Sequence, residues 1–596
     1  MCGFLGFYSK FEEMNEEIFK KSLNIIKHRG PDNSKIYKYD NLLFGFNRLS
    51  IIDPHLRSSQ PMYNNKNIIM FNGEIYNFLE IKNNFFDKTN FLTNSDTEVV
   101  LKCLSSNNYI TLINEMNGMF SIASYNKDKN KLLLIRDRLG QKPLYFYKNN
   151  NSFIFSSEVK PILSIIEKYD FEYSYFDKYF FEDTDERNGI TLFKKIEQVL
   201  PGEIIELDFN HFTIHRKKWY KPKLNYKFKN FNKNKKLKLK SQIESSVEMC
   251  LLSDRETCIS FSGGLDSSLL SILINKYKKI DNINLIFDDD YEEKKNIKRV
   301  SKELNIKSEE IVFKENDFLD YFKKSIYHLE SPSGGLINVA FFKFYEEVSK
   351  KYKVIFDGTG LDEFFCGYEI HLLKYLHNLF TNKDNSLENF FDKINLHKNM
   401  VDKYTKKLTK IGNKQINIDS STIYLDKFLN KSYKKEINFF SSTDIDEFYY
   451  DLIFKTKIPK NNRLKDRSSM ASGVELRQPF LDHNIFEFAF KIPFEDHFDH
   501  RLRTKAVLRD LYEQNLPKSI LNNKKFSIQS PQNKWITNNT ITSYLLDNLN
   551  KKNNYLENMF NIEKIKKYIY KNKDKNLKNS VFHWKILNFF MLIETF

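Results

Sequence analysis

The chain has 596 residues, which is too long for a single hydrophobic core, so two or more domains are expected. Hydrophobic residues account for 41% and aromatic residues for 15% of the sequence, which excludes an intrinsically disordered chain. The formal net charge of +17 would suit a nucleic-acid-binding protein, but Lys is spread along the whole chain. We therefore expect no nucleic-acid partner, and we interpret the densest basic run, residues 221–240, as a solvated connector.

The sequence also argues against a membrane or secreted protein. No run of 18 or more apolar residues is present, so we expect no membrane span. The N-terminus lacks a basic region followed by an apolar stretch, so we expect no secretory signal. The five cysteines show neither metal-ligand spacing nor a framework of pairs, which predicts a reducing cytoplasm as the location.

The first candidate for chemistry is Cys2. If Met1 is removed, Cys2 carries a free α-amine, whose pKa is about 7.7–8.0. The amine could then take the proton of the Cys2 thiol, as in an N-terminal nucleophile. An early cysteine usually has no catalytic role, so the following motifs decide the interpretation.

Those motifs recur in a fixed order along the first part of the chain. They are Met1-Cys2-Gly3, His28-Arg29-Gly30-Pro31-Asp32, Arg48-Leu49-Ser50-Ile51-Ile52-Asp53, Gln60-Pro61, Phe71-Asn72-Gly73-Glu74-Ile75-Tyr76-Asn77 and Ser95-Asp96-Thr97-Glu98. Over about 205 residues they resemble the class II glutamine amidotransferases. The resemblance implies an α+β sandwich of two antiparallel sheets flanked by helices, and it makes Cys2 the nucleophile that hydrolyses glutamine.

The resemblance also assigns the residues that would bind glutamine. Attack on the amide creates an oxyanion, which needs fixed N–H donors, and these are the Asn72 side chain and the Gly73 backbone. The guanidinium of Arg48 suits the glutamine carboxylate, and Asp96 with Glu74 suits its ammonium.

The rest of this half is interpreted as scaffold. Segments 118–120, 132–145 and 153–158 match the same family and predict strands and a hairpin. We therefore expect a glutaminase domain at residues 1–210, a linker at 211–236 and a second domain at 237–596.

The second domain opens with a helical pattern, residues 237–252, and then a buried strand, Thr257–Phe261. Two glycines follow, and an apolar-periodic helix begins at Ser267. A strand, a Gly turn and a helix N-terminus present unpaired N–H groups to an anion, and Asp266 adds a hard oxygen ligand for Mg²⁺. The loop is not a Walker A motif, because the Gly-Lys-Ser/Thr ending is absent. It resembles the pyrophosphate-binding loop of ATP pyrophosphatases, which assigns ATP binding to Ser262, Gly263, Gly264, Asp266, Ser267 and Ser268.

Strand and helix signals then alternate at residues 283–287, 292–304, 310–313 and 353–356, which predicts a parallel α/β sheet. The last strand is followed by Gly358 and then by Asp362 and Glu363, at the strand end where open sheets bind ligands. Gly358 is therefore a candidate for ATP binding and Asp362 for Mg²⁺. A carboxylate pair of this kind is also common at a helix start.

A long string, residues 465–483, is followed by Thr504-Lys505-Ala506-Val507-Leu508-Arg509. From about residue 240 to 540 the sequence resembles the synthetase domain of glutamine-hydrolysing asparagine synthetases, so the whole chain has the order of that enzyme. The resemblance implies that ATP adenylates a carboxylate acceptor, that Lys505 neutralises charge on the phosphates, and that ammonia reaches the acyl-adenylate through an internal tunnel. Members of the family are often dimers, so a homodimer is also implied.

Departures from the family gather around the acceptor. Thr359 stands where the family usually has an acidic residue, Asp357 where a Ser is common and Cys366 where a Gly is usual, while Glu330 keeps one acidic residue of an otherwise altered motif. The first hypothesis is amidation of aspartate. The second is the same mechanism acting on another carboxylate, such as a uronic acid of a surface glycan or a peptide. The third is a non-catalytic scaffold homologue. A nucleic-acid-binding protein rests on net charge alone and predicts a steeply salt-dependent affinity.

Overall fold

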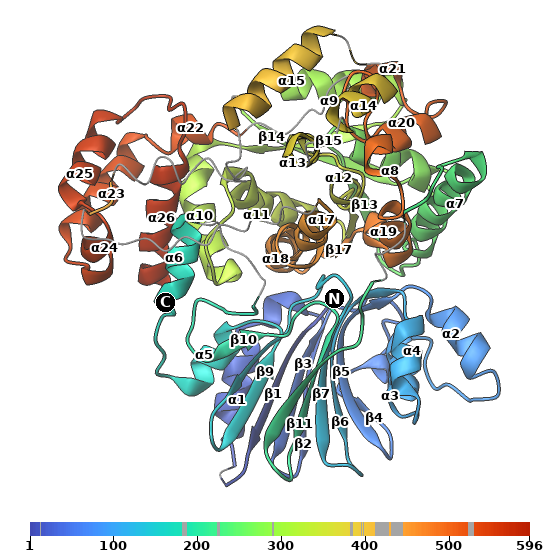
Figure 1. The fold of residues 1–596 in the computed structure, drawn as a ribbon. Helices are drawn as coiled ribbons and strands as arrows, with labels where there is room; N and C mark the ends of the chain where they lie inside the picture. Colours follow the sequence, from blue (N-terminus) through green and yellow to red (C-terminus); the bar gives the residue numbers. More distant parts are fainter. Residues whose placement is uncertain are drawn as a thin grey trace.

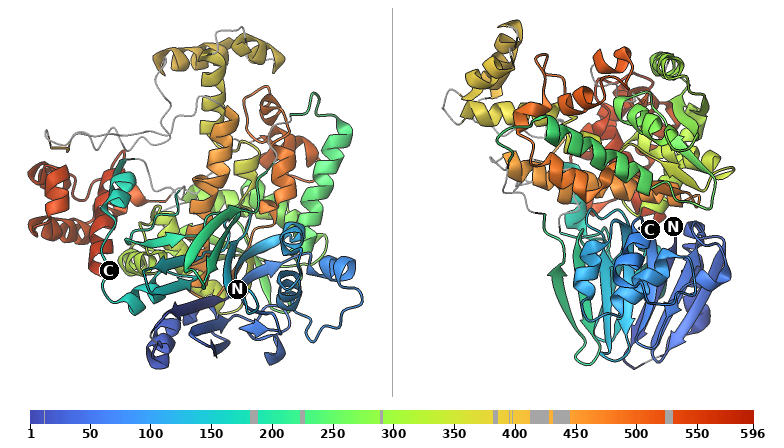
Figure 2. Two further views of the ribbon diagram at one scale, coloured as in Figure 1. Left: turned by 60° about the horizontal axis from the view of Figure 1, so that its bottom comes forward. Right: turned by 90° about the vertical axis from the view of Figure 1, so that its right-hand side faces the viewer.

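The computed structural model describes residues 1–11, 13–181, 188–222, 227–288, 291–381, 386–394, 396, 398–411, 428–430, 445–522 and 530–596. The chain forms two halves, with a β-sandwich below and an α/β half above, and the N-terminus lies between them (Figure 1). The right-hand view of Figure 2 shows the same arrangement from the side. Among the described residues, no helix combines the length and the hydropathy needed to cross a bilayer.

The lower half is a sandwich of two six-stranded sheets, in which every strand pair is antiparallel. The first sheet has the order β10 (Ile196–Gln198), β8 (Tyr145–Lys148), β9 (Ser152–Ser156), β1 (Gly3–Ser9), β3 (Leu42–Arg48) and β2 (Asn33–Tyr39). The second has the order β12 (Thr213–Lys218), β11 (Glu203–Asp208), β7 (Lys131–Arg136), β6 (Gly118–Asn126), β5 (Asn67–Ile75) and β4 (Met62–Tyr63). The helices of the first 210 residues are α1 (Glu16–Asn24), α2 (Phe78–Phe85), α3 (Asp96–Leu104), α4 (Tyr109–Glu115), α5 (Lys160–Ile166) and α6 (Tyr173–Phe181), of which α6 lies beside α26 in the upper half (Figure 1).

The two faces of each strand explain the layers. On β1, Phe4 packs between the sheets, whereas Leu5 and Phe7 lie in a second cluster with residues of α1 and α5. On β5, Met70 faces the interior of the sandwich and Phe71 packs with residues of α3 and α4. Because successive strand residues point to opposite faces, this alternation places one apolar layer between the sheets and one under the helices on each side. The predicted sandwich is confirmed.

The upper half is built on a five-stranded parallel sheet. Its order is β15 (Ser308–Phe313), β14 (Asp281–Phe287), β13 (Thr257–Ser260), β16 (Val354–Phe356) and β17 (Glu475–Arg477), and all four pairs are parallel. Both faces of the sheet are buried: Cys258 and Ile355 pack with residues of one set of helices, and Ile259 and Phe356 with those of another. The predicted α/β class is confirmed.

Helices cover both faces of this sheet. The helices of this half are α7 (Lys233–Met249), α8 (Leu265–Asn275), α9 (Tyr291–Glu303), α10 (Phe318–Leu329), α11 (Leu336–Ser349), α12 (Leu361–Phe364), α13 (Glu369–Thr381), α14 (Ser386–Lys393), α15 (Lys398–Ile411), α17 (Ile445–Phe454), α18 (Lys457–Met470), α19 (His483–Ala489), α20 (Ala506–Leu511), α21 (Lys518–Asn522), α22 (Gln532–Trp535), α23 (Asn539–Asn550), α24 (Asn554–Met559), α25 (Ile562–Lys571) and α26 (Val581–Thr595). Between residues 370 and 450 the structure describes α13, α14, α15 and the start of α17, and also residues 428–430, where Leu429 forms an isolated bridge with Phe560.

The C-terminal helix α26 joins the two halves. Its Trp584 stacks on Phe318 of α10, with ring centroids 6.0 Å apart, and its Phe589 meets Phe176 of α6 edge-on. Lys585 donates from Nζ to the Phe180 carbonyl at 2.9 Å. The helix therefore docks on α10 of the second half and also contacts α6.

The predicted linker at 211–236 is partly wrong. Residues 213–218 form β12, which pairs along its length with β11. Trp219 donates from Nε1 to the Arg136 carbonyl at 2.9 Å, and α7 begins at Lys233. An exposed edge strand with basic side chains has the composition of a connector, because Lys and Arg protect sheet edges from pairing. We therefore propose a domain boundary after Tyr220.

Candidate active sites

The candidate glutaminase site surrounds the start of β1. Cys2 is 7% exposed, and its backbone N–H donates to Oδ1 of Asn72 at 3.0 Å. Asn72 lies on β5, and the next residue, Gly73, lies so close to β6 that a Cβ atom would come within 2.0 Å of the Met119 carbonyl oxygen. Only glycine fits there, which keeps the backbone beside Asn72 uncovered. The predicted nucleophile and both predicted oxyanion donors are thus neighbours.

Met1 is buried at the interface of the two halves. Its ammonium group forms an ion pair at 3.0 Å with Glu475 of β17, and neither group is exposed. While Met1 is attached, the Cys2 nitrogen is an amide and cannot act as a base. Burial also raises the pKa of the Cys2 thiol above its ordinary value, although the neighbouring ammonium opposes this.

Carboxylates converge beside this ammonium. Asp96, at the start of α3, accepts a hydrogen bond from the Ile75 backbone at 3.0 Å, and burial raises its pKa to about 6. Burial, with Glu475 and Asp96 nearby, raises the pKa of Glu74. Arg477 of β17 pairs with Glu475 at 2.7 Å and lies 3.8 Å from Glu74. The predicted ammonium-binding pair Glu74 and Asp96 is therefore together, and the sequence did not indicate that Glu475 and Arg477 complete it.

Arg48 lies near the same site, but its guanidinium group is hydrogen-bonded to backbone carbonyl groups. Its guanidinium donates to the carbonyls of His55 at 2.8 Å and Asp53 at 2.6 Å. These contacts fix the loop after β3, and Asp53 in turn caps that loop through Ser58 and Asn94. The predicted contact of Arg48 with the glutamine carboxylate stays a prediction.

The second candidate site is the loop between β13 and α8. Ser262 donates from its backbone to Oγ of Ser267 at 3.1 Å, and Gly264 donates to Oγ of Ser262 at 3.4 Å. Gly263 has a φ of 67°, a left-handed conformation that favours glycine. The hydroxyls thus brace the turn that presents the N-terminus of α8.

Lys505 bridges two carboxylates beside this loop. Its Nζ lies 2.6 and 2.7 Å from the two oxygens of Asp266 and 2.6 Å from Oδ1 of Asp362. Burial alone would lower the pKa of Lys505, but the two carboxylates raise it above its ordinary value, so the ammonium stays charged. Gly367 makes room for this cluster, since a Cβ atom there would come within 2.0 Å of Oδ1 of Asp362 and 2.4 Å of Cε of Lys505.

The loop and Lys505 line one pocket of about 130 Å³, together with Arg299 of α9 and Arg509 of α20. Of the predicted ATP-binding residues, this pocket contains Ser262, Gly263, Gly264, Asp266 and Ser267, and also the predicted metal ligand Asp362. Ser268 does not line it and is fully buried, because consecutive helical residues point about 100° apart and the next side chain turns into the core. Gly358 lies behind Asp266, where a Cβ atom would come within 3.1 Å of the Asp266 backbone.

Comparison with known proteins connects these two sites. A family model described as asparagine synthase matches residues 238–594, and one described as a glutamine amidotransferase domain matches residues 1–220. The chain belongs to the asparagine synthase family. It is a glutamine amidotransferase of the asparagine synthetase type, with a glutaminase domain and an asparagine synthase domain.

Several relatives align over most of their length. Asparagine synthetase (glutamine-hydrolyzing) 1 of Bacillus subtilis is 29% identical over 90% of this chain and 88% of its own. Putative asparagine synthetase (glutamine-hydrolyzing) 2 of Methanocaldococcus jannaschii is 31% identical, with coverage of 63% and 77%. Asparagine synthetase B (glutamine-hydrolyzing) of Escherichia coli is 27% identical, with coverage of 62% and 65%.

A network of buried ion pairs joins the glutaminase domain to α18 of the asparagine synthase domain. Arg29 donates from Nε to the Cys2 carbonyl at 3.1 Å and from Nη1 to Asp466 at 2.9 Å. Arg467, the next residue on α18, pairs with Glu158 at 2.9 Å and with Glu330 at 2.8 Å. The backbone of the nucleophile is thus connected directly to a helix of the other domain.

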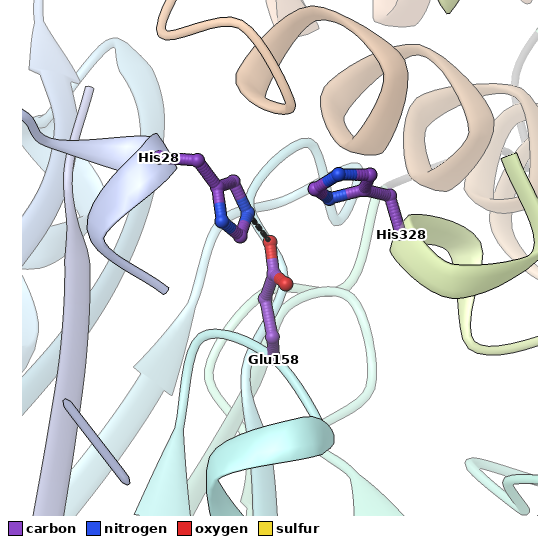
Figure 3. A group of neighbouring side chains, drawn as sticks. All are labelled: His28, Glu158 and His328. Carbon is purple, nitrogen blue, oxygen red and sulfur yellow. Dashed lines mark hydrogen bonds and ion pairs between the residues drawn. The ribbon is translucent and has the colours of Figure 1, made fainter. Parts of the chain in front are cut away.

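One part of this network has the spacing of a metal site. His28, Glu158 and His328 point toward one another from the two domains (Figure 3), and Nε2 of His28 lies 3.1 Å from Glu158. However, Glu158 also pairs with Arg29, Lys160 and Arg467 at 2.8–3.0 Å. A divalent cation would be repelled by these three charges. We interpret the cluster as part of the interdomain ion-pair network.

Proposed function

We propose that this protein makes asparagine from aspartate, with glutamine as the nitrogen donor and ATP as the source of energy. The observation that carries the proposal is the position of Lys505, which lies between Asp266 and Asp362 at the N-terminus of α8. A buried lysine beside a helix N-terminus and two carboxylates suits a polyphosphate that must be held and then released. Membership of the asparagine synthase family supports the same chemistry.

In the glutaminase reaction we assign Cys2 as the nucleophile. Once Met1 is removed, the new α-amine accepts the thiol proton and the thiolate attacks the glutamine amide carbon. Asn72 and the Gly73 N–H bind the resulting oxyanion, and each such donor is worth about 3–4 kcal/mol in a transition state. The amine returns its proton as ammonia leaves, and water then releases glutamate from the thioester. The carboxylates of Glu74 and Asp96 bind the substrate ammonium, and Arg48 its carboxylate.

In the synthetase reaction, an oxygen of the acceptor carboxylate attacks the α-phosphorus of ATP, and pyrophosphate leaves. Lys505, Arg299 and Arg509 supply positive charge to the departing pyrophosphate from the walls of the pocket that they line. Asp266 and Asp362 offer the hard carboxylate oxygens that Mg²⁺ prefers, and the phosphates of ATP would offset its repulsion from Lys505, Arg299 and Arg509. When bound, Mg²⁺ supplies further charge neutralisation to the phosphates.

Ammonia must then reach the acyl-adenylate without meeting bulk water, which would protonate it. Met1 lies in a buried apolar cluster with Leu49 and Met119 of the glutaminase domain and Val354 and Met470 of the asparagine synthase domain. Its removal would vacate space between Cys2 and the second domain, and we propose that ammonia crosses the interface there. The side chains of this cluster are apolar, while Glu475 and Arg477 lie beside the Met1 ammonium.

The proposal is tested by measuring AMP and pyrophosphate release from the protein with Cys2 at its N-terminus, in the presence of glutamine, ATP, Mg²⁺ and a panel of carboxylates. Release that is stimulated by aspartate, with asparagine formed in equal amount, is the expected result. Turnover with glucuronate but none with aspartate would refute aspartate as the acceptor and retain the mechanism. Absence of glutamine hydrolysis would refute the whole proposal.

A further inference from the structure

A second charged cluster lies one strand away from the pyrophosphate loop. Asp357 follows β16, which pairs in parallel with β13, so the two strand ends reach the same edge of the sheet. The next residue, Gly358, lies against the backbone of Asp266. The side chains of Asp357 and Thr359 both contact Nζ of Lys465 of α18. The cluster therefore lies next to Asp266, and none of its three side chains lines the pocket that contains Arg299 and Arg509.

The internal contacts of this cluster leave one donor available. Oδ1 of Asp357 lies 2.6 Å from Nζ of Lys465 and accepts the Thr359 backbone N–H at 2.9 Å. Lys465 also contacts the Thr359 hydroxyl, so two of its three N–H groups are engaged. Within the part of the chain that the structure describes, the third has no partner, and the Lys465 side chain remains 18% exposed. Lys465 is thus a cation held in place by its neighbours, with one N–H group that can donate a hydrogen bond to a ligand.

An acceptor that carries a second anionic group needs such a cation. Its reacting carboxylate must approach the α-phosphate, and a further carboxylate on the same molecule would be buried beside a polyphosphate without compensation. Lys505 is already shared between Asp266 and Asp362, and the two arginines lie in the wall of the pyrophosphate pocket. Lys465 is a cation outside that wall, and it contacts Thr359, where the sequence departs from the family.

We propose that Lys465 is a specificity-determining residue that binds the carboxylate of the acceptor that is not amidated. Asp357 and the Thr359 hydroxyl orient the ammonium group of Lys465. The acceptor that this arrangement would select is a short dicarboxylic acid. This inference rests on the proposed function, since it takes the amidated substrate to be a free dicarboxylic acid. A neutral side chain at position 465 would remove the preference for acceptors with a second carboxylate, and the residues that bind ATP would remain.

The test compares three acceptors that differ by one group at a time. Aspartate has both carboxylates, succinate lacks the ammonium and β-alanine lacks the second carboxylate. Glutamine-dependent AMP release is measured with each for the wild-type protein, Lys465→Met, Lys465→Arg and the double variant Lys465→Met with Asp357→Asn. Lys350→Met is the matched control, because among the described residues the Lys350 side chain pairs only with Glu347, at an exposed position.

We expect Lys465→Met to lower kcat/KM by the same factor, roughly 10- to 100-fold, for aspartate and for succinate, as fits the loss of one charge-assisted hydrogen bond. The value for β-alanine should not change, and Lys465→Arg should keep part of the preference. The double variant, which no longer leaves the Asp357 carboxylate unpaired, should still lack the preference. A merely structural role predicts an equal loss with all three acceptors and recovery in the double variant, and that result would overturn the inference.

The outcome also separates this inference from the proposed function. If the wild-type protein releases AMP with aspartate and Lys465→Met keeps the same ratio of aspartate to β-alanine, only the role of Lys465 fails. If the wild-type protein releases no AMP with any dicarboxylate, the proposed function fails and the role of Lys465 fails with it.

Discussion

Replacement of Lys505 by Met should lower both the stability of the protein and the rate of AMP release, and a second substitution should separate the two effects. Lys505 is 5% exposed and is shared by Asp266 and Asp362, so Lys505→Met removes the buried cation that both carboxylates contact. Breaking a buried pair in this way costs about 3–5 kcal/mol. The side chains of both aspartates remain 18–19% exposed, so water compensates in part and we expect about 3 kcal/mol.

Lys505→Met should also slow the reaction itself. Hydrogen bonds to charged groups contribute about 1.5–3 kcal/mol each, so losing two to a pyrophosphate would slow AMP release by a factor of roughly 10² to 10⁴. Stability is measured by urea denaturation and activity by AMP release at saturating aspartate. Adding Asp362→Asn to Lys505→Met removes one of the two carboxylates and should recover most of the stability but none of the activity.

Two results would refute this reasoning. If Lys505→Met retained AMP release within a factor of three, Lys505 would not act on the phosphates. If Asp362→Asn restored activity together with stability, the role of Lys505 would be confined to neutralising the two aspartates.

Three further predictions concern the glutaminase domain. Cys2→Ala should abolish asparagine formation from glutamine and leave formation from added ammonia; loss of both, measured by amino-acid analysis, would mean that the two sites are not separable. Asp96 has a pKa of about 6 and must be ionised to bind the glutamine ammonium, so KM for glutamine should rise as the pH falls through 6. Asp96→Asn should have a high KM that does not change across this range, and a wild-type KM that stays constant from pH 7.5 to 5 would contradict the assignment. Asp466→Asn removes a charged partner of Arg29, which holds the Cys2 carbonyl, so it should lower glutamine hydrolysis about tenfold or more and leave ammonia-dependent synthesis nearly unchanged. Equal loss of the two activities would instead indicate a general defect in folding.

The elements that were predicted well are those with strong local patterns. The strand at 257–261, the glycine turn and the following helix appear as β13, the loop and α8, with the helix starting at Leu265 and not at Ser267. Strands β14, β15 and β16 lie within two residues of their predicted bounds. Apolar runs bounded by glycine or charge are decided by nearby residues, so the sequence alone was sufficient.

Other features depend on residues that are distant in the sequence. Arg299 reaches the ATP pocket because α9 crosses over between β14 and β15, and nothing in its own helix distinguishes it from other surface cations. Glu475 lies 474 residues from Met1 and forms an ion pair with its ammonium. The edge strand β12 has the composition of a connector, because its side chains are largely exposed and basic. Each of these follows from tertiary packing, which a local pattern does not report.

The central claim is that nitrogen passes from glutamine to a carboxylate within one protein molecule. The most direct test supplies amide-¹⁵N glutamine, aspartate and ATP together with an excess of unlabelled ammonium, and measures the label in the product by mass spectrometry. We predict one ¹⁵N-labelled asparagine for each AMP released, with little dilution by the unlabelled ammonium. Label that equilibrates with the bulk ammonium, or AMP release without any labelled amide, would contradict the claim.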